Sequence, residues 1–81
     1  MEYSLHEKMN RLLMESGYKN RVQVAGALVE NGIYKSMNTA LSDLHKIIKG
    51  KLPASQKFLE GLERLSINPK KFTEIIEEFE K

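Results

Sequence analysis

From Lys35 to Leu65 the chain reads KSMNTALSDLHKIIKGKLPASQKFLEGLERL, and this stretch predicts a helix, a stop, a short basic loop and a second helix. The apolar residues of its first half recur at intervals of four, three and four positions. That spacing keeps side chains on one face of a helix. The apolar face consists of Met37, Leu41, Leu44 and Ile48, widened by Ile47.

The opposite face of this predicted helix is polar and mostly basic. It carries Asn38, Thr39, Ser42, His45, Lys46 and Lys49. A row of hydrogen-bond donors and cations is what a helix lying against nucleic acid presents. The one carboxylate in the row, Asp43, is repelled by phosphate, so it either accepts from a cytosine amino group or pairs with Lys46 or Lys49.

A glycine and a basic loop follow the helix. Gly50 can adopt a positive φ and close the helix, Lys51 adds a cation, and Pro53 prevents the helix from continuing. Ser55 is suited to cap the next helix, and the free N–H groups at Ser55 and Gln56 can hold a phosphate oxygen. The apolar side of that helix again has helical spacing, with Phe58, Leu59, Leu62 and Leu65.

The run from Leu44 to Ser55 resembles the end of the recognition helix and the following loop in Cro/CI-type (Xre-like, lambda-repressor-like) helix-turn-helix repressors. In that family an apolar, polar, basic, apolar sequence leads to a Gly, a basic residue and a Pro or Ser that starts the fourth helix. The resemblance extends more loosely over Met9–Ile67. Where the family has the Gly of its tight turn this chain has Asn38, and its own turn, Asn31-Gly32, lies six residues earlier. An enlarged turn is therefore expected.

The resemblance implies that this helix reads double-stranded DNA in the major groove and that the protein is a small transcriptional regulator, a repressor or modulator of phage or plasmid type. Asn can pair with adenine and Lys with guanine. We therefore expect base contacts from Asn38, Thr39, Ser42 and Lys46, and phosphate contacts from Lys49 and Lys51. Counted back from Gly50, the family's contacting positions fall on Ala40 to Asp43, His45 and Lys46, with Leu41 expected in the core.

Two capped helices precede this region. Ser4-Leu5-His6-Glu7 is a capping box and predicts a helix that ends near Glu15 or Ser16, before Gly17. Tyr18 is expected to pack on the core, with a phosphate contact as the alternative. The buried stripe of this first helix is Leu5, Met9, Leu12 and Leu13.

Asn20-Arg21-Val22-Gln23 is a second cap and opens the next helix. The family bonds a DNA phosphate through a Gln near this point, so the resemblance makes Gln23 and Arg21 candidates; capping by Gln23 is compatible with that role. After the turn at Asn31-Gly32, either Ser36 or Asn38 caps the following helix. The expected core side of the second helix is Val22, Ala25, Gly26, Val29 and Ile33, with the small pair Ala25-Gly26 allowing another helix to approach closely.

Asn68-Pro69 predicts a last helix over residues 69–80, beyond a core of residues 4–67. Its apolar stripe is Phe72, Ile75, Ile76 and Phe79, and its other face is acidic. The stripe either folds back onto the core or contacts a partner, and we assign it as a candidate dimer or partner contact. An alternative function follows from it, a helical protein-interaction module of antirepressor or antitoxin type.

Composition narrows the remaining possibilities. The 81 residues fit one all-α domain of five helices, residues 1–81, that contains a helix-turn-helix. The chain has no Cys and no membrane-length apolar run, so we expect a cytoplasmic protein without disulfides, thiolate zinc sites or membrane contact. His6 and His45 are expected at the surface, and no arrangement suggests catalysis, a metal, a cofactor or a small-molecule substrate.

Charge is distributed unevenly within the net +2. Residues 1–34 have four basic and four acidic side chains, residues 35–71 have eight basic and three acidic, and residues 72–81 have one basic and four acidic. The positive charge thus surrounds the predicted recognition helix, which favours a surface for phosphate. An ordinary solvated surface is the plainer alternative.

Overall fold

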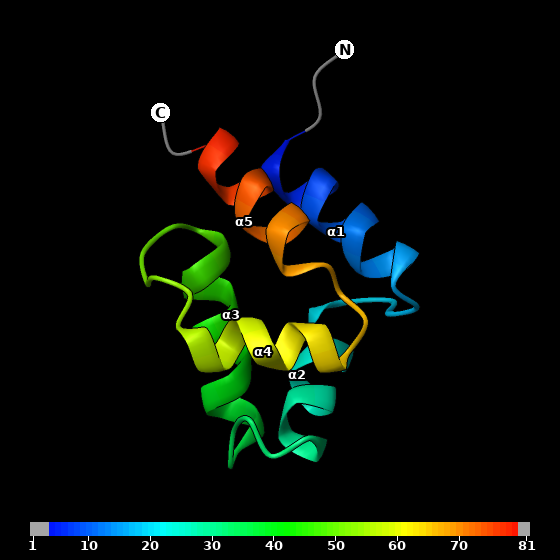
Figure 1. Cartoon of the computed structure of the whole chain (residues 1–81), viewed down its shortest axis with the longest axis vertical. Helices are drawn as coiled ribbons and strands as arrows, with labels where there is room; N and C mark the ends of the chain where they lie inside the picture. The colour runs from blue at the N-terminus through cyan, green and yellow to red at the C-terminus, as the bar shows by residue number, and fades with distance from the viewer. Residues whose placement is uncertain (1–3, 80–81) are drawn as a thin grey trace.

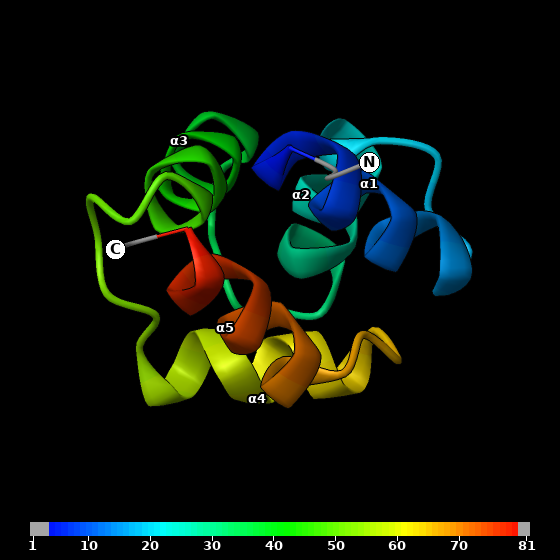
Figure 2. The same cartoon turned by 90° about the horizontal axis from the view of Figure 1, so that it is seen from above.

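The computed structural model describes residues 4–79, and within them it contains five α-helices and no strand. α2 and α3 pack together at one end of the molecule, α1 and α5 lie side by side at the other, and α4 crosses in front of α2 and α3 in this view (Figure 1). Seen from above, α4 runs along one edge and α3 and α1 along the other (Figure 2). The predicted all-α, five-helix domain is confirmed. The helices are α1 (Leu5–Glu15), α2 (Arg21–Glu30), α3 (Met37–Ile48), α4 (Gln56–Arg64) and α5 (Pro69–Glu78).

A polar side chain caps the start of each helix. In every case its oxygen accepts the backbone N–H of the third residue after it, at 3.0 to 3.2 Å. The caps are Ser4, Asn20, Ser36, Ser55 and Asn68. Ser36 rather than Asn38 therefore caps α3, and Asn38 lies in its first turn. At the other end of the chain α5 stops at Glu78, short of the predicted residue 80, which lies outside the described residues.

Four helices end in the same left-handed turn. The turn residues Gly17, Gly32 and Gly50 close α1, α2 and α3 with φ of 96°, 75° and 76°, and Ser66 closes α4 with φ of 63°. In each turn the next residue's N–H bonds back to a carbonyl of the helix, as Lys51 does to Lys46 at 2.8 Å and Ile67 to Leu62 at 3.0 Å. Serine pays a steric penalty in this conformation that glycine avoids.

The core draws apolar side chains from all five helices. Phe58 of α4 and Phe72 of α5 lie at its centre, with ring centroids 5.6 Å apart. Phe72 and Ile76 are buried within this chain, so assigning them as dimer or partner contacts was wrong, and α5 folds back. Such a small chain has few large apolar residues, and burying each one contributes about 1.5 to 3 kcal/mol. Ile75 is half-buried against the same core, and Phe79 is 40% exposed.

The predicted core side of α2 was partly wrong. Val24, Ala25 and Leu28 are its buried residues, whereas Val22 is 52% exposed. Apolar residues surround this helix on nearly every side, so their spacing does not define one face. Packing against α1 and α3 selects the buried side instead.

The tightest glycine in the packing is one that the sequence pattern did not single out. A Cβ added at Gly26 would meet its nearest neighbour, Met37 Sδ, at an ordinary 3.8 Å. A Cβ at Gly61 of α4 would lie 2.9 Å from Ile33 Cγ1 and 3.1 Å from Leu28 Cδ2. Gly61 therefore lets α4 pack closely against Leu28 in the last turn of α2 and against Ile33. No helix within residues 4–79 has the length and apolarity needed to cross a membrane.

Candidate nucleic-acid interface

The outward face of α3 carries the polar residues that the sequence places there. Asn38, Thr39, Ser42, Lys46 and Lys49 are all exposed, and His45 is half-buried at one edge. The inward face is Ala40, Leu44, Ile47 and Ile48.

Three expectations for α3 were wrong. Ala40 is completely buried and cannot be a contacting position, although the family alignment placed one there. Met37, expected in the apolar stripe, is 38% exposed, and Leu41 is half-buried rather than in the core. All three differences follow from the extensive packing of α3 against α2, which selects the buried face of α3.

A shallow depression brings most of the predicted contacts of this region together. It has a volume of about 440 Å³ and opens between the last turns of α3 and the basic loop. Ser42, His45, Lys46, Lys49 and Lys51 line it. Asn38 lies one helical turn before Ser42 and extends the same surface toward the start of α3.

Asp43 finds its partner in the turn rather than on its own helix. Its carboxylate lies close enough to Tyr34 to act on the phenol, and within residues 4–79 it forms no ion pair with Lys46 or Lys49, the partners that were expected. Burial, and then the charge of Asp43 and its hydrogen bonding to the phenol, raise the pKa of Tyr34 to about 12. The interaction places the linker of residues 31–36 beside this part of α3. Sequence reasoning missed Tyr34, because a single Tyr in a turn has no pattern.

On the other edge of the polar face, Arg21 joins three helices. Its Nη1 donates to His45 Nδ1 of α3 at 3.0 Å, and its Nη2 donates to His6 Nδ1 of α1 at 2.6 Å. Because a guanidinium can only donate, both imidazoles must accept at Nδ1 and carry their proton on Nε2. Within residues 4–79 no His, Asp and Glu side chains converge as a three-ligand metal site.

Positive charge dominates the surroundings of this cluster. Burial lowers the pKa of His45, and the charges of Arg21, Lys49 and His6 lower it further. Burial also lowers the pKa of Arg21 from its usual 12.5, which leaves that side chain fully charged. His6, expected to be a surface histidine, is exposed but engaged. No local sequence signal links it to Arg21 and His45, because only the packing of three helices brings them together.

The other predicted phosphate contacts are exposed but already hold structural bonds. Gln23 Oε1 accepts the N–H of Lys19 at 2.8 Å. Ser55 caps α4, and Gln56 donates weakly to Glu60 at 3.4 Å. Ser55 and Gln56 do not line the α3 depression; they form a separate site at the start of α4.

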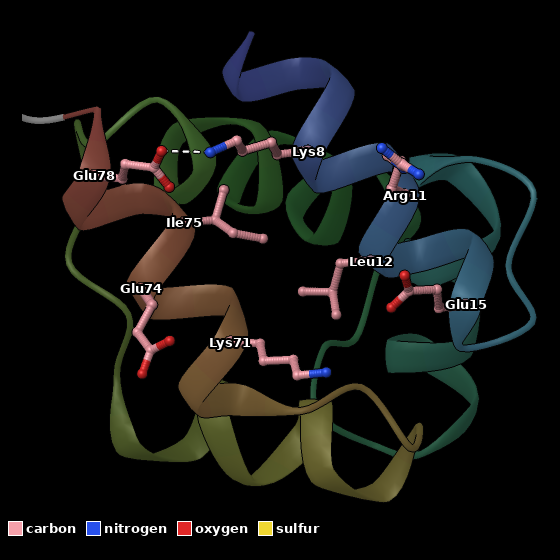
Figure 3. Close-up of a pocket in the computed structure, with 8 residues that line it drawn as sticks. All are labelled: Lys8, Arg11, Leu12, Glu15, Lys71, Glu74, Ile75 and Glu78. Carbon is pink, nitrogen blue, oxygen red and sulfur yellow. Dashed lines mark hydrogen bonds and ion pairs between the residues drawn. The ribbon is translucent and has the colours of Figure 1, made fainter. Parts of the chain in front are cut away.

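A second groove, of about 380 Å³, lies between α1 and α5. Leu12 and Ile75 project into it from facing helices, and an ion pair between Lys8 and Glu78 closes one end (Figure 3). Its rim mixes both charges, with Lys8, Arg11 and Lys71 against Glu15, Glu74 and Glu78. Lys8 Nζ also lies 5.6 Å from the centre of the Phe79 ring. This groove holds α5 to the domain and has neither the single sign of charge nor the polar row of α3.

No protein-family model matches this chain, and no significant match was found among curated proteins or solved structures.

Proposed function

We propose that the protein binds double-stranded DNA in a sequence-specific manner through the exposed face of α3, as a small cytoplasmic transcriptional regulator of the Cro/CI helix-turn-helix type with an enlarged turn. One observation carries the proposal. The exposed face of α3 combines amide, hydroxyl and ammonium groups, while its single carboxylate, Asp43, is engaged by Tyr34 at the edge.

The chemistry of this face suits base recognition. Asn38 can form paired hydrogen bonds with adenine, and Lys46 can donate to guanine; Ser42 between them can donate or accept. Lys49 and Lys51 lie toward the loop, where they suit phosphate contacts that orient the helix. The N-terminal turns of α2 and α4, with Gln23, Ser55 and Gln56, supply further N–H donors for phosphate.

The acidic part of the chain is compatible with this orientation. α5 packs mainly against α1 and α4, and its Glu74, Glu77 and Glu78 are exposed. The alternative of a protein-interaction module needs the apolar stripe of α5, most of which is committed to the core of the same chain. The burial of Phe72 and Ile76 therefore favours DNA binding over that alternative. A DNA-bound homodimer would place half-sites roughly 10 bp apart or a multiple of that.

The first experiment compares two duplexes: the DNA upstream of the protein's own gene and a scrambled version, each titrated at two salt concentrations. Specific recognition is supported by a preference for the native duplex that persists at the higher salt, because non-specific phosphate binding weakens steeply with salt. Equal binding to both duplexes that disappears at the higher salt refutes it.

A matched pair of variants then separates base contacts from phosphate contacts. Lys46→Ala should relax base preference and cost about 1 to 3 kcal/mol at one base pair. Lys51→Ala should weaken binding to all duplexes about equally and reduce the slope of log affinity against log salt by about one. Equal losses that do not depend on sequence, for both variants, would contradict the assigned roles.

A further inference from the structure

The contact of His6, Arg21 and His45 is unusual in its charge. Arg21 is half-buried, and within residues 4–79 no carboxylate lies within ion-pair distance of it. Its two hydrogen-bond partners are imidazoles, which accept these bonds only in their neutral form and so bring no negative charge. The charged groups that face His45 are Arg21 of α2, Lys49 of α3 and, when protonated, His6 of α1. Two cations, Arg21 and Lys49, and two titratable imidazoles thus meet where three helices pack, and within residues 4–79 no carboxylate pairs with Arg21.

A partly buried cation is stabilised by a negatively charged partner. Here the cluster borders the depression lined by His45 and Lys49, so an anion arriving from solvent can reach it. Arg21 is also the first residue of α2, where the helix dipole and free N–H groups favour negative charge. A phosphate group matches this site, because its oxygens accept from a guanidinium and from imidazolium N–H groups together.

We propose that the His6–Arg21–His45 cluster binds a phosphate group and takes up a proton as it does so, which makes binding tighter as the solution becomes more acidic. The inference rests on the proposed function where the phosphate belongs to a DNA backbone; inorganic phosphate is the other source of the same chemistry.

The proton balance follows from the two hydrogen bonds. In the free protein each Nδ1 accepts from Arg21, so a proton added there would remove a hydrogen bond and place a second positive charge beside the guanidinium. When a phosphate oxygen accepts from Arg21 instead, an imidazole Nδ1 is released. It takes a proton from solvent and donates it in a new hydrogen bond to the phosphate, with no covalent bond formed or broken.

The direction of the pH dependence is fixed by the same charges. Arg21 and Lys49 oppose a proton on His45 in the free protein, and an adjacent phosphate favours it. The pKa of His45 should therefore rise on binding, and affinity should increase as the pH falls through that interval. A rise of one half to one unit corresponds to about three- to tenfold tighter binding.

The wild-type protein allows a direct test, because it has only two histidines. Their ring C–H proton signals can be followed by NMR through a pH titration of the free protein, of its complex with a duplex, and in inorganic phosphate at constant ionic strength. A higher pKa of His45 in the presence of either ligand supports the inference. Binding of the duplex with an unchanged His45 titration overturns it and leaves the proposed function standing.

A second measurement uses duplex affinity at about pH 7.5 and about pH 5.5, with each protein serving as its own reference. The wild-type ratio of affinities should be about three- to tenfold. His45→Gln should reduce the ratio toward one, since Gln has no titrating group, whereas Lys51→Gln should weaken binding at both pH values and keep the ratio. An unchanged ratio in His45→Gln overturns the inference. If no duplex binds at either pH while inorganic phosphate raises the pKa of His45, the anion site stands and the proposed function fails.

Discussion

Two glycines in the middle of helices should respond in opposite directions to the same substitution. Gly26 of α2 has ordinary space for a methyl group, with the nearest atom 3.8 Å from the position of its Cβ. Gly61 of α4 has none, since a Cβ there would meet Ile33 Cγ1 at 2.9 Å and Leu28 Cδ2 at 3.1 Å. Alanine in place of glycine favours a helix interior by about 1 kcal/mol, and overpacking a core costs about 1 to 3 kcal/mol.

Gly26→Ala should therefore raise the free energy of unfolding by about 0.5 to 1 kcal/mol. Gly61→Ala should lower it by about 1 kcal/mol, because the clash exceeds the helix gain. In a domain of this size each kcal/mol shifts the melting temperature by roughly 4 to 8 °C. Urea denaturation followed by circular dichroism measures both variants, with an unchanged slope as the sign that only stability has altered.

The result that would refute this reasoning is a shift of the same sign and size in both variants. Stabilisation by Gly61→Ala would mean that α4 does not press on Ile33 and Leu28 as described. Destabilisation by Gly26→Ala would instead place the close approach at α2, where the sequence pattern alone suggested it.

Three further perturbations test other parts of the structure. Ser66→Gly should raise the free energy of unfolding by about 0.5 to 1 kcal/mol in a thermal denaturation, because Ser66 has a φ of 63°; a loss of stability would contradict the strained turn. The variant Asp43→Asn should bind duplex DNA about twofold more tightly at low salt, because one charge that repels phosphate is removed from the edge of α3. Fluorescence anisotropy measures this affinity, and weaker binding by the variant would contradict the placement of α3 on DNA. The pKa of His45 is lower in the folded protein than its usual 6.5, so the stability that this group contributes is present above pH 6.5 and is lost as the pH falls through the folded value. Urea denaturation at about pH 7.5 and about pH 5.5 should show this loss of stability. In His45→Gln the stability should fall less between the two pH values; a fall equal to that of the wild type would contradict the lowered pKa of His45.

Local signals in the sequence predicted the helices well. Caps such as Ser4 and Asn20 and stops such as Gly17 and Gly50 act through backbone hydrogen bonds to residues a few positions away, so a short stretch contains the whole interaction. The polar face of α3 was predictable for a related reason. Its apolar residues are confined to one side, which leaves the other side to solvent.

Prediction failed where the outcome depended on how helices pack. α2 is apolar on most sides, so its sequence does not indicate that Val24 and Leu28 are buried while Val22 is exposed. Position 61 has no room for a side chain because Ile33 and Leu28, which are distant along the chain, pack against it. The stripe of α5 was equally suited to a partner or to its own core, and only the fit of Phe72 against Phe58 decides for the core.

By itself, the sequence determined the number of helices, most of their limits and the chemical character of the α3 surface, because these depend on interactions within one or two helical turns. The tertiary structure alone decided which polar and charged side chains of different elements meet. It joined Asp43 to Tyr34 and set Arg21 between His6 and His45, and so defined both edges of the candidate interface. Such contacts join side chains of separate elements, and their energies depend on distances of a few ångströms that only the packed helices fix.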